Sequence, residues 1–211
     1  MKVRERLAEI LDRGDGEREL QAFLKENPVI LLETPMSVLG HPNIVLEEFP
    51  LGTQYRADFV IIAPYSGAFD ILLIEIEPPK EKIFTKDKVL AKRANKAFEQ
   101  INSWKSYIRN HRSEVLETIN RYAKEKDLYR GPRDSFTCTA GKTIFDPVVH
   151  VSFSYAIMMG RRSDLPDDML GRKAEFKEDS NVEIITCDRL FHAADKIDAN
   201  PEIYIESGRR R

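Results

Sequence analysis

Residues 70–80 read DILLIEIEPPK, and this stretch decides the fold. Alternate side chains of a strand share one face, so Glu75 and Glu77 lie together on the same face as Leu73. Apolar residues occupy both faces before Glu75, which is typical of a central strand covered on both sides. The two prolines that follow end the strand.

The two glutamates need an explanation at the end of such an apolar strand. A buried carboxylate is costly unless it is paired or binds a metal, and two adjacent carboxylates also repel each other. One interpretation is that the strand simply emerges into solvent at Glu75, because charged residues are mostly exposed. The other interpretation is a functional site built from these acids. The sequence of the preceding strand helps to decide between the two.

Residues 54–62, QYRADFVII, predict this preceding strand, in which Asp58 stands between apolar neighbours. The turn residues of APYSGAFD, at 63–70, predict that the two strands form an antiparallel hairpin. Asp58 can then lie beside Glu75, and three carboxylates converge with Glu77 at one end of the sheet. Hard cations such as Mg²⁺ or Mn²⁺ prefer oxygen ligands, so these three acids are the candidate metal ligands.

The remaining pattern predicts a single α/β domain with a mixed central sheet flanked by helices. A stripe of apolar residues at helical spacing identifies a long helical region over 88–126, with Leu90, Ala94, Ala97, Phe98, Ile101, Trp104 and Ile108 facing inward. Residues 164–181 are polar and are expected to be irregular. Further helices are predicted over 3–12, 17–28 and 188–197, further strands over 43–50, 148–159 and 182–187, and a loop over 130–142.

Charge is distributed unevenly along the 211 residues, although the net charge is only −2. Between positions 80 and 133 there are 15 Lys and Arg against 7 Asp and Glu, a local balance of +8 in an otherwise acidic chain. Such a block is either a set of solvated helix faces or a surface that faces phosphates. The basic block begins directly after the candidate metal ligands, so Lys80, Lys82, Lys86 and Arg93 are candidate DNA contacts.

The ordered series of Asp58, the EIE triplet at 75–77 and a helix with Gln100 resembles the core of the PD-(D/E)XK nuclease superfamily. More narrowly, the chain resembles the Shedu-type antiviral nuclease domain, the DUF4263 family, from about residue 17 to about residue 195. The segments that carry this resemblance are ERELQAFLKENPVILL, RADFVII, LLIEIEPPKEKIFTK, AFEQINSWKSYI, MMGRR and VEIITCDRL.

The resemblance implies roles for individual residues. It implies that Asp58 and Glu75 bind metal, that Glu17 is a helix acid joining the site, and that Gln100 is the polar residue of the helix packed on the metal-bearing strands. Glu77 occupies the position where the superfamily usually has Lys, so it is expected to act as a further ligand or as a general base. A lysine at position 80, 82 or 86 is expected to replace the missing cation.

Two other motifs bear on function. The AGKT sequence at 140–143 lacks the earlier glycine of a phosphate-binding loop, because position 136 is Phe, so no nucleotide cofactor is expected. Arg161 and Arg162 follow a predicted strand, where they either hold phosphate or pair with Asp164.

These features predict a metal-dependent DNA endonuclease or nickase of a bacterial anti-phage defence type, with Mg²⁺ or Mn²⁺ as cofactor. The rival interpretation is a non-catalytic DNA-binding or assembly module that retains the nuclease fold. No apolar run approaches the ~20 residues of a membrane helix, and two distant cysteines indicate a reducing compartment, so a cytoplasmic protein is expected. The family resemblance implies that the protein forms a homo-oligomer. Residues 1–16 are expected to be an N-terminal helix, 17–195 the core and 196–211 a tail.

Overall fold

The computed structural model describes residues 2–13, 16–38, 44–125 and 137–202. In these ranges one five-stranded sheet has the order β1-β2-β3-β4-β5. The first three strands are antiparallel neighbours, whereas β3, β4 and β5 are parallel, which confirms the predicted α/β fold with a mixed sheet. The strands are β1 (Ile44–Leu51), β2 (Tyr55–Tyr65), β3 (Ala68–Ile76), β4 (His150–Met158) and β5 (Val182–Ile185).

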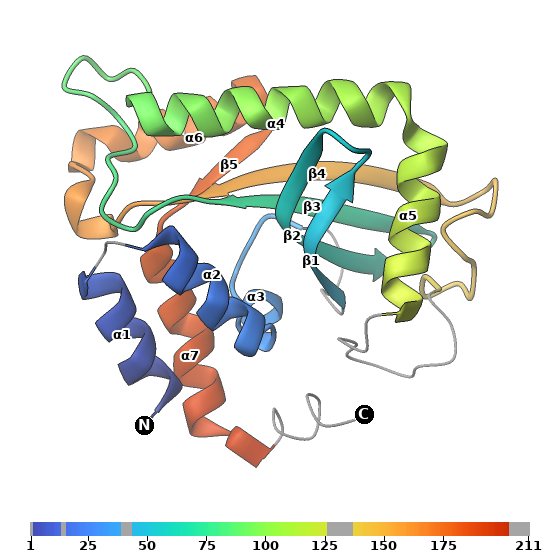
Figure 1. Ribbon diagram of the computed structural model, residues 1–211, viewed down its shortest axis with the longest axis horizontal. Helices are drawn as coiled ribbons and strands as arrows, with labels where there is room; N and C mark the ends of the chain where they lie inside the picture. The colour runs from blue at the N-terminus through green and yellow to red at the C-terminus, as the bar shows by residue number, and fades with distance from the viewer. Residues whose placement is uncertain (1, 14–15, 39–43, 126–136, 203–211) are drawn as a thin grey trace.

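Helices cover both faces of the sheet, as Figure 1 shows. One face is packed by α4 (Lys92–Asn110), α5 (Arg112–Glu125) and α6 (Leu170–Ser180). The opposite face is packed by α1 (Val3–Arg13), α2 (Glu17–Glu26), α3 (Val29–Glu33) and α7 (Leu190–Ala199). Short 3₁₀ turns, Arg162–Asp164, Asp167–Met169 and Cys187–Arg189, connect the elements near the ends of β4 and β5.

Strand β3 is buried along its whole length, which confirms its predicted central position. Ile71 and Leu73 pack into the core on the α4 side, whereas Leu72 and Ile74 pack into the core on the α7 side. The predicted hairpin is also confirmed, because β2 pairs with β3 in antiparallel register. Its turn is shorter than 63–70, since Tyr65 already pairs with Ala68.

The apolar stripe of the long helix lies as predicted. Its buried residues are Ala94, Ala97, Ile101, Trp104 and Ile108. Two further members of the predicted stripe, Leu90 and Phe98, are partly buried against the same core. The stripe fixes the rotation of α4 about its own axis, and it therefore determines which polar side chains of α4 reach the sheet.

The expectation of irregular structure over 164–181 is wrong, because α6 occupies most of this segment. No residue of α6 is fully buried, and its sequence correspondingly lacks the strong apolar periodicity that identifies α4. Arg, Lys, Ala and Glu are good helix formers, and Phe176 packs edge-on against Phe98 with ring centroids 5.0 Å apart. Asn181 ends the helix in the left-handed conformation.

The first and last described helices lie side by side. The backbone N–H groups of Val3 and Arg4 donate to the carboxylate of Asp198 at 2.9 and 3.0 Å. Helix α7 extends to Ala199, so the first positions of the predicted tail are helical. Part of the predicted loop, 130–136, lies outside the described residues. No helix within the described ranges is long and apolar enough to cross a membrane.

Candidate functional site

The sequence-predicted acids lie where β2 and β3 run beside each other. The register pairs Phe59 with Ile74, so Asp58 and Glu75 are the next residues along the two strands and face each other. The Oδ2 atom of Asp58 accepts a hydrogen bond from the backbone N–H of Ile76 at 2.7 Å. This bond anchors the Asp58 carboxylate to the end of β3, beside the candidate ligands.

Glu75 is buried, and among the described residues only one of its two carboxylate oxygens has a hydrogen-bond partner. Its Oε1 atom accepts a hydrogen bond from Nε2 of Gln100 on α4 at 2.8 Å, which joins the strand to the helix packed on it. Its Oε2 atom is buried without a hydrogen-bond partner in the described part of the chain. Burial, together with the nearby carboxylates of Asp58, Glu77 and Glu17, raises the pKa of Glu75 to about 9, and the Gln100 bond offsets only a small part of this rise.

The pKa of Asp58 is raised for the same reasons, but by less than that of Glu75. Burial, together with the charges of Glu17 and Glu77, raises the pKa of Asp58 to about 6. The Ile76 N–H and a hydrogen bond from Gln21 offset part of the increase. The protein thus holds several carboxylates close enough that they cannot all ionise cheaply without a cation.

Arg93 supplies one positive charge to this cluster. Its Nε donates to Oε2 of Glu77, and its Nη2 lies 2.6 Å from Oε2 of Glu17 on α2. The pKa of Glu77 is raised by burial, and Arg93 offsets part of that rise. A cation therefore does pair with Glu77, and it comes from α4. Of the three lysines expected to supply this charge, Lys80 instead donates to the carbonyl oxygen of Arg13, and the role of Lys82 or Lys86 stays a prediction.

The donor set fits a hard divalent cation in its chemistry. All the candidate ligands are carboxylates, and the buried Oε2 of Glu75 has no other partner among the described residues. No group of three His, Cys, Asp or Glu side chains in the described ranges already has the arrangement of a metal site. Asp58, Glu75 and Glu77 are therefore suitable ligands that are not drawn together into a closed set, and Glu77 is bonded to Arg93.

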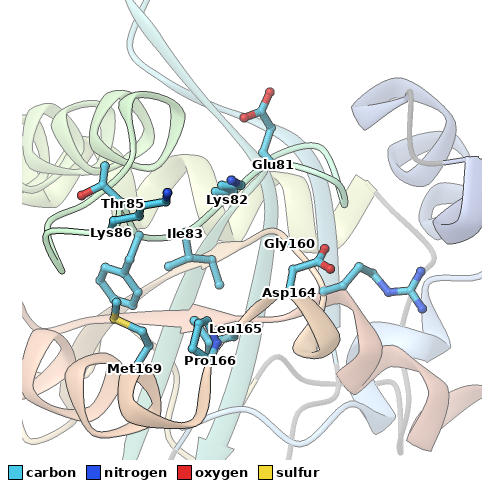
Figure 2. A pocket seen from close by; sticks show the side chains of 12 residues that line it. Glu81, Lys82, Ile83, Thr85, Lys86, Gly160, Asp164, Leu165, Pro166 and Met169 are labelled. Carbon is cyan, nitrogen blue, oxygen red and sulfur yellow. The ribbon is translucent and has the colours of Figure 1, made fainter.

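Two hollows flank the segment that follows the acids. The first, of about 390 Å³, lies between residues 81–86 and residues 160–169, as Figure 2 shows. Ile83 and Leu165 give it an apolar lining, and Lys82 and Lys86 stand at it. The second, of about 550 Å³, is lined by Arg93 and by other residues of the first turns of α4, together with Glu81. Glu81 lines both hollows, so they adjoin.

The predicted DNA contacts differ in whether they already form ion pairs with acids of the protein. Lys82 and Lys86 are exposed and have no acidic partner in the described ranges. Arg161 instead pairs with Asp188 at 2.8 Å and with Asp12 at 3.1 Å. Arg162 lies 3.6 Å from Asp167 and bonds the carbonyl oxygen of Leu165. The alternative that these arginines pair with Asp164 is wrong, because other acids are nearer to both guanidinium groups.

Two features of the site escaped the sequence interpretation. Gln21 stands four residues after Glu17, on the same face of α2, and bonds both Glu17 and Asp58. This i, i+4 spacing is visible in the sequence and is the signal that points to it. The contact of Arg93 with Glu17 and Glu77 has no comparable signal, because it depends on how α4 crosses the end of the sheet.

Residues 15–191 match the model of a protein family described as "Shedu protein SduA, C-terminal". The resemblance to the Shedu-type domain is thereby confirmed, and the matched span contains each of the candidate site residues that the sequence predicts. A search of curated proteins gives no match to this chain.

Proposed function

Because this chain belongs to the family described as Shedu protein SduA, C-terminal, we propose that it is a metal-dependent DNA nuclease acting in anti-phage defence. Family membership points to the defence role. The observation that carries the nuclease activity is the convergence of carboxylates from α2, β2 and the end of β3, with one buried oxygen of Glu75 left without a partner in the described chain. Such a buried acid cluster is a common setting for a perturbed catalytic group.

Asp58, Glu75 and Glu77 would hold Mg²⁺ or Mn²⁺, which when bound activates water and stabilises charge on a phosphoryl group. The protein orients two of these ligands through neighbours that belong to regular structure. Gln100 fixes Oε1 of Glu75 from a helix, and the Ile76 N–H fixes Oδ2 of Asp58 from a strand. Ligands fixed in this way need little reorganisation during the reaction.

Exposed lysines beside the acids supply the complementary charge for the DNA backbone. Lys82 and Lys86 stand at the first hollow, and Lys92 and Lys96 line the second. None of the four has an acidic side chain within ion-pair distance among the described residues. Their positive charge is therefore available to phosphates, and we expect the affinity for DNA to fall steeply as salt increases.

The decisive experiment incubates the purified protein with supercoiled and linear DNA in Mg²⁺, Mn²⁺ or EDTA. We expect cutting only with a divalent cation, and a loss of about 100-fold or more in the Glu75→Gln variant. Glu117→Gln, which changes an exposed acid of α5, is the matched control and should cut normally. Cutting that persists in EDTA, or in Glu75→Gln at the wild-type rate, would refute the proposal.

A second candidate is a non-catalytic DNA-binding or assembly module. It is favoured by the ion pairs of Arg93 with Glu17 and Glu77, which satisfy two acids of the cluster without a metal. This candidate predicts DNA binding without cutting, and no gain in melting temperature on adding Mn²⁺. Both quantities are measured on the same preparation, so the two functions are directly distinguished.

A further inference from the structure

Arg93 spans the boundary between the acid cluster and solvent. Its guanidinium group bonds Glu77, whose side chain is 5% exposed, and Glu17, whose side chain is 32% exposed. The Arg93 side chain is itself 39% exposed, so part of it reaches solvent. The same residue therefore contacts the acids and remains accessible to a ligand from outside.

Arg93 neutralises only part of the negative charge of the acid cluster. One guanidinium group bonds two of the four carboxylates, while Oε2 of Glu75 has no partner in the described residues and Asp58 is bonded by neutral donors. A divalent cation bound to Glu75 and Asp58 would also use Glu77 as its third candidate ligand. Arg93 engages the Oε2 atom of Glu77, so a cation that binds Glu77 through this oxygen, or through both oxygens, competes with Arg93.

On its solvent side Arg93 lines a hollow whose net charge is positive. This hollow, of about 550 Å³, is lined by three cationic residues, Lys92, Arg93 and Lys96, by Asn95 and by two acids, Glu81 and Glu99. Lys92 and Lys96 are four residues apart, so they lie on one side of α4. A phosphate that enters meets three cationic groups, and arginine binds phosphate oxygens through paired N–H donors. The hollow thus offers Arg93 an anionic partner other than Glu77.

We propose that Arg93 couples DNA binding to divalent-cation binding. Without DNA, Arg93 holds Glu17 and Glu77; a DNA phosphate at Lys92 and Lys96 takes over its guanidinium group and frees Glu77 for the cation. This inference rests on the proposed function, of which it specifies the order of events. DNA then raises the affinity for the cation, and the cation raises the affinity for DNA by the same factor, because linkage is reciprocal.

The test measures Mn²⁺ affinity by electron paramagnetic resonance of the free ion, with and without a saturating short DNA duplex. For the wild type we expect the duplex to raise Mn²⁺ affinity by about 5-fold or more. Arg93→Met removes the charge and keeps an unbranched apolar side chain. In this variant Mn²⁺ should bind more tightly than in the wild type without DNA, and the duplex should add nothing.

Two further variants separate competition from general effects of charge and folding. Arg109→Met removes the same group from an exposed position near the other end of α4, and it should keep both the wild-type Mn²⁺ affinity and the wild-type coupling. Arg93→Lys keeps the charge, so it should retain part of the coupling between DNA and Mn²⁺ binding. If Arg93→Met fails to melt cooperatively, the coupling measured in Arg93→Lys tests the proposal in its place.

The outcomes separate this inference from the proposed function. If the wild type cuts DNA with Mn²⁺ but its Mn²⁺ affinity does not respond to DNA, the coupling is wrong and the nuclease stands. Equal Mn²⁺ affinity without DNA in the wild type and Arg93→Met would also overturn the coupling. If no Mn²⁺ binds with or without DNA, and no DNA is cut, the proposed nuclease fails and the coupling fails with it.

Discussion

Replacing Glu75 with Gln tests the electrostatic state of the acid cluster without DNA and without metal. Gln100 can still donate to the remaining carbonyl oxygen, and the new amide nitrogen replaces the Oε2 atom that is buried without a partner in the described chain. The shape and the packing are therefore retained, while the ionisable group is removed. Any change in how stability depends on pH then reports on Glu75.

The sign follows from the raised pKa. The pKa of Glu75 is raised from an ordinary value of 4.5 to about 9, so between these values the folded protein holds a proton that the unfolded chain has released. Stability must therefore fall as pH rises through this window. One proton corresponds to ~1.4 kcal/mol per pH unit, so between pH 5 and pH 8 Glu75 lowers the free energy of unfolding by at most about 4 kcal/mol.

Glu75→Gln should remove this slope in EDTA. At pH 5 the melting temperatures of the wild type and the variant should nearly agree, because a protonated glutamic acid and a glutamine side chain are both uncharged and similar in shape. At pH 8 the variant should melt higher by up to roughly 8 to 16 °C, since 1 kcal/mol shifts the melting temperature of a chain of this size by about 2–4 °C. Differential scanning calorimetry across pH measures both quantities.

Two outcomes would refute this reasoning about Glu75. Parallel pH profiles for the wild type and Glu75→Gln would mean that Glu75 ionises normally in the folded protein. A variant that melts lower at every pH would mean that its charge stabilises the site. Glu117→Gln is the control, because an exposed acid of the same type should leave the slope unchanged.

Three further predictions address the two lysines at the first hollow, the candidate ligand Glu77 and the turn after β4. Lys82→Ala combined with Lys86→Ala should weaken DNA binding and reduce the dependence of log affinity on log salt by about 2, and an unchanged slope in a fluorescence anisotropy titration would place the phosphates elsewhere. Glu77→Gln should slow cutting by about 100-fold while DNA affinity holds or rises, which a cleavage assay and the same titration measure; normal cutting would remove Glu77 from the mechanism. Gly160→Ala should lower stability by about 1–3 kcal/mol in urea unfolding, because φ is +66° there and a Cβ atom would lie 2.9 Å from a backbone oxygen of Glu81; equal midpoints would contradict this.

The hairpin and its acids could be predicted from the sequence because they depend on local order. Alternation in β2 and β3 decides which face each side chain occupies, and the antiparallel connection sets Asp58 beside Glu75. Gln100 is expected only from the family resemblance, and the helical stripe, which turns α4 onto the sheet, explains why its amide reaches Glu75. These residues lie on regular elements, where the backbone period determines direction.

The rest of the site depends on contacts that no local period encodes. Arg93 and Glu77 are 16 residues apart, and their meeting depends on the path of the segment 78–91 before α4 begins. The engagement of Arg161 by Asp12 joins positions 149 residues apart. Helix α6 escapes prediction for a different reason, since none of its residues is fully buried, and it is held by helix propensity, by contacts with β5 and by Phe176 against Phe98.

The contact between Asp198 and the start of α1 means that α1 completes its packing only after α7 has been synthesised. Leu7, Ile10 and Leu11 form the buried side of the first helix, and α7, against which α1 packs, is the last helix of the described chain to be made. At about 5–20 residues per second, a ribosome needs roughly 10 to 40 s to travel from Val3 to Asp198. During that interval the apolar side of α1 can pack against α2 but not against α7, so we expect chaperones that bind nascent chains to act on α1 until α7 is made.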